Sequence, residues 1–85
     1  MFLIDDAALL KIRHAVERHT KGVQFTDDTP LISGGILDSL AIVDILLDLE
    51  RAFGIRVPAI DVQPDDFDSI RMIAGTLARL QGKNR

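Results

Sequence analysis

The sequence predicts an all-α fold: a bundle of three main helices plus one short helix, with a long loop between helices one and two. Three stretches of apolar residues recur at three- and four-residue steps, the spacing of amphipathic helices. Aspartate or serine precedes these stretches and glycine follows two of them, which are typical start and stop signals. We expect residues 1–85 to form one domain, large enough for a modest core but small for an enzyme with a closed pocket.

The first helix is expected to run to about His19, with Asp5 or Asp6 as its cap. Its buried face is predicted to contain Leu9, Ile12, Val16 and His19, widened by Ala8, Leu10 and Ala15. The short apolar segment at residues 2–4 is expected to tuck under the bundle. Residues 20–37 follow as a long loop that crosses the bundle, so that the first two helices run nearly antiparallel. Its expected anchors are Val23, Phe25, Leu31, Ile32 and Ile36.

The second helix is predicted over Ser39–Phe53, with Asp38 as its cap and Gly54 as its stop. Before it, Gly34 and Gly35 allow positive φ angles or close packing. On a helical wheel the core face contains Ile42, Ile45, Leu46, Leu49 and Phe53. A second apolar stripe contains Leu40, Val43 and Leu47. It is either a docking surface for partners or is covered by the long loop, and the sequence favours neither.

Beyond Gly54, the segment Ile55–Pro58 reads as an extended connector, because a residue before proline avoids the α region. Pro64 suits the first turn of a short third helix at Asp65–Phe67. Asp68 or Ser69 is expected to cap the last helix, which residues 82–85 end. Its apolar positions are Ile70, Ile73, Ala74, Leu77 and Leu80.

Composition excludes several classes of function. The net charge of −3 and the scattered basic residues disfavour nucleic-acid binding. The absence of cysteine removes disulfides, zinc–thiolate sites and a thiol nucleophile, so a thioester would require an imported thiol. We expect no metal site in the chain, no membrane span and a cytoplasmic location, since residues 1–10 lack the features of a secretory signal and no apolar run reaches ~20 residues.

The head of the second helix carries the most specific pattern. The string is Leu31-x-x-x-Gly35-Ile36-Leu37-Asp38-Ser39-Leu40, followed by an apolar helix that ends Leu49-Glu50-x-x-Phe53-Gly54-Ile55-x-Val57-Pro58. This pattern resembles the attachment site of acyl and peptidyl carrier proteins. The resemblance covers nearly the whole chain and implies that Ser39, between Asp38 and Leu40, receives a 4′-phosphopantetheine arm from coenzyme A.

The local chemistry suits that arm, because its phosphodiester would lie at a helix N-terminus, where free N–H groups and the helix dipole favour an anion. Asp38 can cap the helix and could also help hold the metal that a modifying transferase needs. The triplet Asp38-Ser39-Leu40 alone would indicate only an ordinary helix N-cap. A serine hydrolase is disfavoured, since no Gly-x-Ser-x-Gly elbow is present and His14 and His19 belong to the first helix.

The resemblance implies a monomeric carrier that is not an enzyme and that presents an aminoacyl or acyl thioester to other enzymes. Its implied partners are a phosphopantetheinyl transferase, an amino-acid- or acyl-activating ligase, and a downstream acyltransferase or synthase. The chain is similar to D-alanyl and related aminoacyl carriers, although these tend to have Trp where Phe67 stands. The alternatives are a fatty-acid or polyketide acyl carrier and an unmodified helical interaction module. The expected docking face centres on Val43 and Leu47, flanked by Asp44 and Glu50.

Overall fold

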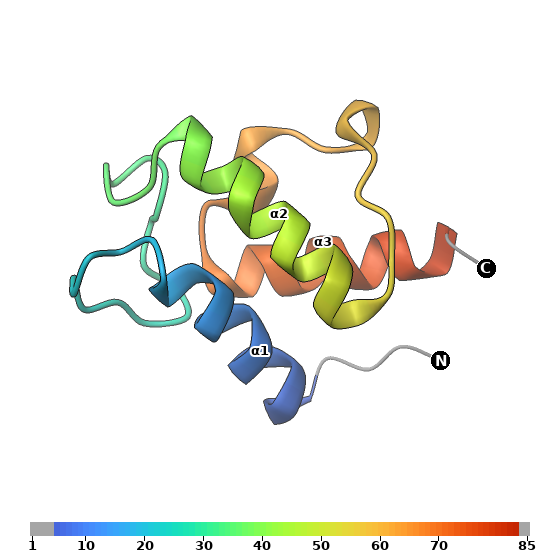
Figure 1. The fold of residues 1–85 in the computed structure, drawn as a ribbon, viewed down its shortest axis with the longest axis horizontal. Coiled ribbons are helices and arrows are strands. Elements are labelled where there is room, and N and C mark those ends of the chain that lie inside the picture. The colour runs from blue at the N-terminus through green and yellow to red at the C-terminus, as the bar shows by residue number, and fades with distance from the viewer. Residues whose placement is uncertain (1–4, 84–85) are drawn as a thin grey trace.

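The computed structural model describes residues 5–83 and shows an all-α fold, as predicted (Figure 1). The helices are α1 (Asp6–Glu17), α2 (Ser39–Phe53) and α3 (Ile70–Lys83), with 3₁₀ turns η1 (Ala59–Asp61) and η2 (Pro64–Phe67) between α2 and α3. No strand occurs within residues 5–83. The prediction for residues 2–4 lies outside the described residues.

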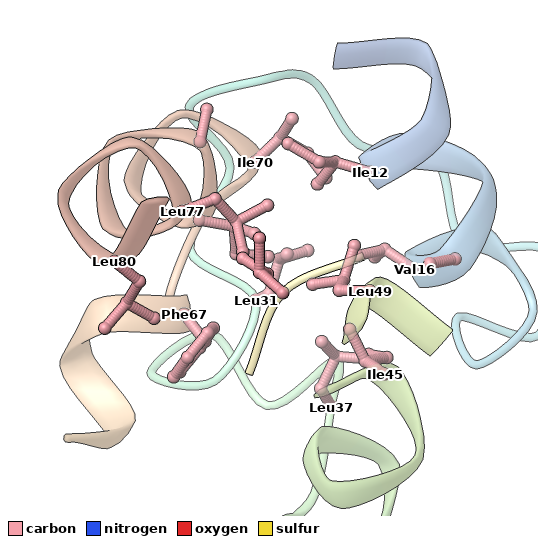
Figure 2. Packing of buried hydrophobic residues seen from close by; sticks show 14 residues of the cluster. Ile12, Val16, Leu31, Leu37, Ile45, Leu49, Phe67, Ile70, Leu77 and Leu80 are labelled. Carbon is pink, nitrogen blue, oxygen red and sulfur yellow. The ribbon is translucent and has the colours of Figure 1, made fainter. Parts of the chain in front are cut away.

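The three α-helices enclose one apolar core (Figure 2). In Figure 1, α2 lies in front of α3, and α1 and α2 run in roughly opposite directions, as expected for helices joined by a long crossing loop. The loop contributes Leu31 and Leu37 to the core, and η2 contributes Phe67. The buried helix residues of the core are Ile12, Ala15, Val16, Ile45, Leu49, Ile70, Ile73, Ala74, Leu77 and Leu80.

Helix α1 begins as predicted and ends early. The Asp5 carboxylate caps it by accepting the N–H of Ala8 at 2.8 Å. The helix stops at Glu17, two residues before the predicted end, because the N–H of His19 turns back to the carbonyl of Val16 in a tighter turn. Leu10 was wrongly expected in the buried stripe, since it is exposed on the outer side of the helix.

Helix α2 has the predicted bounds, Ser39–Phe53, and ends at Gly54, which takes the left-handed conformation with φ 64°. Ile45 and Leu49 are fully buried, whereas the other predicted core positions are partly buried. These partly buried positions are Ile42, Leu46 and Phe53. The loop before α2 differs from expectation at Val23, which is exposed and anchors nothing.

The segment between α2 and α3 contains two 3₁₀ turns where one short helix was predicted. The second, η2, begins at Pro64 as expected, and Phe67 at its end is buried in the core. The first, η1, begins directly after the predicted connector Ile55–Pro58. The described chain is therefore a bundle of three α-helices with two short 3₁₀ turns, in place of the predicted three main helices and one short helix.

Helix α3 is capped by Ser69, whose Oγ accepts the N–H of Met72 at 3.1 Å. The helix continues through Gly82 and ends at Lys83, within residues 82–85, where its end was predicted. Over the part of the chain that the structure describes, no helix is long and apolar enough to cross a membrane.

Candidate functional site

The loop that leads into α2 is shaped by its two glycines. A side chain at Gly34 would overlap the carbonyl oxygen of Pro30, so the position requires glycine. Gly35 has a φ of 78°, which side-chain-bearing residues rarely adopt. The resulting turn closes with hydrogen bonds from the N–H groups of Ile36 and Leu37 to the carbonyl of Leu31, at 2.9 and 2.8 Å.

Asp68 ties this loop to the start of α3. Its carboxylate accepts the N–H of Ile32 at 2.7 Å, the N–H of Ser33 at 2.9 Å and the hydroxyl of Ser33 at 2.7 Å. The Ser33 hydroxyl, aided by these N–H groups, lowers the pKa of the Asp68 carboxyl. The carbonyl of Asp68 also accepts the N–H of Leu31. The loop before α2 is therefore held by a residue more than thirty positions later in the chain.

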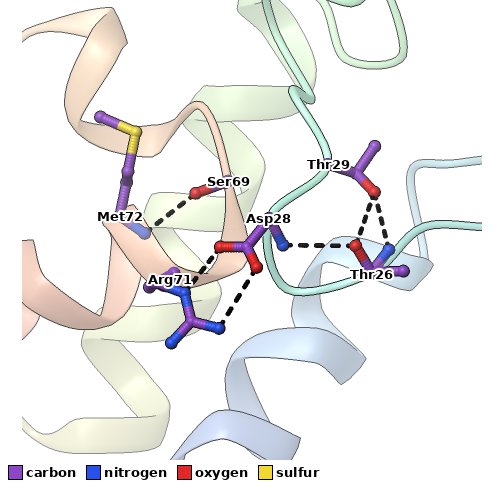
Figure 3. A network of polar contacts seen from close by, with 6 residues as sticks. All are labelled: Thr26, Asp28, Thr29, Ser69, Arg71 and Met72. Atoms are coloured by element: carbon purple, nitrogen blue, oxygen red, sulfur yellow. Dashed lines mark hydrogen bonds and ion pairs between the residues drawn. The ribbon is translucent and has the colours of Figure 1, made fainter.

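A second polar contact joins the same two regions (Figure 3). Arg71 donates to both carboxylate oxygens of Asp28, at 2.6 and 3.3 Å, and its backbone N–H donates to the carbonyl of Asp27. The Arg71 guanidinium lowers the pKa of the Asp28 carboxyl. Both side chains are exposed, so this pair contributes less to stability than the Asp68 contacts.

Asp38 caps α2 by accepting the N–H of Ala41 at 2.8 Å, as predicted. The next N–H, that of Ile42, donates to the Asp38 carbonyl. No other hydrogen bond within residues 5–83 reaches the N–H groups of Ser39 and Leu40. These free donors and the positive end of the helix dipole leave the head of α2 able to bind an anion.

Ser39 is exposed at this helix end, and its hydroxyl makes no hydrogen bond within the described chain. The other two serines differ. The Ser33 hydroxyl donates to Asp68, and Ser69 is buried with its hydroxyl occupied as the α3 cap. Ser39 is thus the serine whose hydroxyl is exposed and makes no hydrogen bond within residues 5–83.

A groove of about 250 Å³ lies beside Ser39, between α2 and the segment that contains η1 and η2. Its walls are mostly apolar. The α2 side is lined by Asp38, Ser39, Ile42 and Leu46, and the opposite side by Val57, Val62, Gln63, Pro64 and Phe67, with Ile32 between them.

Comparison with known proteins decides the family. Residues 11–77 match the family model described as "Phosphopantetheine attachment site". The chain is also 35% identical over 54 residues to D-alanyl carrier proteins of Streptococcus pyogenes serotypes M5 (strain Manfredo), M49 (strain NZ131) and M1, a stretch that covers 64% of this chain and 68% of theirs. The chain belongs to the phosphopantetheine attachment-site family.

As a member of that family, the chain is a carrier that bears covalent 4′-phosphopantetheine, and it is not an enzyme. The head of α2 fits the group. Ser39 offers an exposed oxygen, and the free N–H groups beside it favour the negative charge of a phosphodiester. The arm supplies a thiol, which this cysteine-free chain lacks.

The second apolar stripe of this carrier's α2 is open to solvent. Leu40 is 78% exposed, Val43 55% and Leu47 47%, so the loop does not cover the stripe. The two acidic residues expected to flank it differ. Asp44 is exposed, whereas the Glu50 carboxylate accepts the N–H of Val57 at 2.7 Å and holds the connector after α2.

Two features of the structure were missed by sequence reasoning. Asp68 was considered only as a helix cap, because nothing in the local pattern indicates that its partners are Ile32 and Ser33. Ile60, in η1, is almost fully exposed, and an isoleucine inside a short connector carries no signal of its own.

Of the two histidines, His19 is half-buried and His14 is exposed. Residues 5–83 contain no cluster of three or more side chains suited to a metal ion.

Proposed function

We propose that Ser39 is the attachment site and that the arm carries an activated acyl group as a thioester. The observation that supports this most strongly is the contrast among the serines. Ser39 is exposed with a free hydroxyl, whereas the hydroxyls of Ser33 and Ser69 are engaged in holding the fold. The flanking Asp38 and Leu40 complete the site, with Asp38 as the helix cap.

Intact-mass measurement tests this proposal. After incubation with coenzyme A and a broad-specificity phosphopantetheinyl transferase, the wild-type chain should gain the mass of one arm. Ser39→Ala should gain none, and Ser33→Ala is the matched control that should still gain it. A Ser39→Ala chain that gains the arm, or a wild-type chain that never does, would refute the proposal and favour an unmodified interaction module.

We propose an aminoacyl or other short polar cargo. The relatives found by comparison are named D-alanyl carrier proteins, and the chain shares 35% identity with them. Helix α2 also lacks a dense row of glutamates, because Asp44, Asp48 and Glu50 are mixed with Arg51. Enzymes that need a strongly acidic helix should therefore bind it poorly. Phe67 stands where Trp is usual in such carriers, and its almost fully buried side chain contributes to the wall of the groove beside Ser39.

Loading assays decide between cargo classes. The modified chain should accept an amino acid, D-alanine first, from an amino-acid-activating ligase faster than a fatty acyl group from an acyl-activating ligase. Efficient fatty acyl loading and elongation would instead assign the chain to fatty-acid or polyketide synthesis. With either cargo, a downstream acyltransferase or synthase would receive the carried acyl or aminoacyl group.

Partners are proposed to dock on the exposed stripe centred on Val43 and Leu47, beside Asp44 and near Glu50. The stripe begins at Leu40, directly after Ser39, and Val43 lies one helical turn further on, so an enzyme that covers the stripe is close to the arm. Interfaces of this kind are small and transient, with apolar contacts at the centre and charges at the rim that set orientation.

Charge insertion tests this surface. Val43→Asp and Leu47→Asp should slow modification or loading while moving the melting temperature little, because both side chains are already exposed. Ile45→Asp is the buried control on the same helix and should unfold the protein. If Val43→Asp or Leu47→Asp unfolds the chain in the same way, the docking face lies elsewhere.

We further propose that residues 1–85 act as one carrier domain, as a monomer, in the cytoplasm where coenzyme-A-dependent enzymes work. Sedimentation of the modified chain tests the monomeric state.

A further inference from the structure

A groove of about 350 Å³ runs between α1 and α2, on the side of α2 away from the groove beside Ser39. Two alanines, Ala15 and Ala52, leave room for it, and charged side chains line the rest. Those charged or titratable residues are Lys11, His14, Arg18, Asp48 and Arg51.

The charge of this groove is opposite to that of the chain. Lys11, Arg18 and Arg51 supply three positive charges against the single negative charge of Asp48, a local formal charge of +2 in a chain of −3. Arg18 lies 3.6 Å from Asp48, so that carboxylate is already paired. Lys11 lies over the ring of Phe53, 5.6 Å from its centroid, and Arg51 is exposed. The segment from residue 61 to 68, by contrast, contains four aspartates.

The groove is continuous with the docking stripe. Arg51 follows Leu47 by one helical turn, so the two side chains are neighbours on the surface of α2. Around the surface of α2, the stripe is therefore followed by Arg51 and Asp48. The groove comes next, and α1 forms its other wall. A protein that covers Val43 and Leu47 would have its edge over the basic groove.

We propose that this basic groove binds an acidic segment of the partner enzyme that docks on the Val43–Leu47 stripe. The inference rests on the proposed carrier function. Apolar contact with the stripe would supply affinity, and the charged contact would fix the rotation of the carrier about α2, so that Ser39 faces the enzyme's active site. A concave site between two helices fits a protruding protein segment, whereas a membrane presents a flat surface.

The test uses a soluble helical peptide that carries glutamates along one face, titrated into the isotope-labelled, unmodified chain. Backbone amide shifts should change in residues 11–18 and 48–52, and the binding should weaken on going from about 20 mM to about 500 mM salt. A peptide of the same length with glutamine in place of glutamate should produce no such shifts. Shifts that appear elsewhere, or none at all, would overturn the proposal.

Matched variants sharpen the result. The double variant Lys11→Glu, Arg51→Glu should raise the Kd of the peptide at least about tenfold, since two attractive charges become repulsive. Lys21→Glu makes the same kind of change at an exposed position outside the groove and should leave the Kd within about twofold. If the reversed pair fails to fold by circular dichroism, the neutral pair Lys11→Gln, Arg51→Gln gives the same comparison with a smaller expected change.

Two further measurements separate other occupants. Binding to vesicles that contain phosphatidylglycerol, in preference to the peptide, would show that the groove recognises a lipid surface and would overturn the assignment. Salt-sensitive self-association of the wild-type chain in sedimentation, lost in the double variant, would show that a second copy fills it. Because the peptide titration uses the unmodified chain, its outcome is independent of the mass assay on Ser39, and failure of one does not imply failure of the other.

Discussion

Replacing Asp68 with alanine removes the contact that holds the loop before α2. Three hydrogen bonds would be lost, from the N–H of Ile32 and from the N–H and hydroxyl of Ser33. Because two of these three bonds are exposed to solvent, each is taken at about 0.5 to 1 kcal/mol, and the free energy of unfolding should fall by about 1.5 to 3 kcal/mol. In a domain of this size, that loss lowers the melting temperature by roughly 6 to 24 °C.

Urea unfolding followed by circular dichroism measures this loss. Asp65→Ala is the matched control, because Asp65 is an exposed aspartate three residues earlier, and its loss should change stability by less than about 0.5 kcal/mol. Asp68→Asn should lie between the two, since an amide keeps one acceptor oxygen without the negative charge. An Asp68→Ala chain as stable as Asp65→Ala would refute the assignment of Asp68 as the anchor of the loop.

Three other predictions concern stability. Gly34→Ala should destabilise by at least about 1 kcal/mol, because the new methyl group would overlap the Pro30 carbonyl, and an unchanged urea midpoint would contradict this packing. Gly75→Ala should stabilise by about 0.5 to 1 kcal/mol, since the glycine lies inside α3 and an added methyl would meet no described atom within 4 Å; a lower midpoint would count against that open space. The pKa of Asp68 is lowered in the folded state, so its stabilising contribution is complete above the usual aspartate value of 3.8 and is lost as the pH falls through the lowered folded value. Thermal unfolding from pH 6 to pH 2 should therefore show a smaller acid loss for Asp68→Asn than for the wild type, and parallel curves would argue against the shift.

The elements that the sequence predicts well are those whose determinants lie within a few residues. The bounds of α2 follow from Asp38 before it and Gly54 after it, and both act as predicted, one as an N-cap and the other in the left-handed conformation. Ser69 is likewise a local cap. The exposure of Ser39 follows from its place at the first turn of that helix.

What could not be predicted depends on contacts that are distant in sequence or on small energy differences. Asp68 bonds to residues 35 and 36 positions earlier, and no periodic pattern records that pairing. The early end of α1 at Glu17 depends on the local turn in which the N–H of His19 bonds to the carbonyl of Val16, a difference that helix propensity does not resolve. The exposure of the Val43–Leu47 stripe depended on the path of the long loop, whose backbone bonds to the start of α3 through Asp27 and Leu31 and which leaves the stripe open.

The anchor at Asp68 also affects the order of events during synthesis. Ser39 and the loop before it leave the ribosome well before residue 68, so Ile32 and Ser33 lack their anchor until the start of α3 follows. An enzyme that recognises the anchored loop would therefore act on the folded chain and pass over nascent or truncated ones. In that case the contact between the loop and α3 makes modification a check on completed folding.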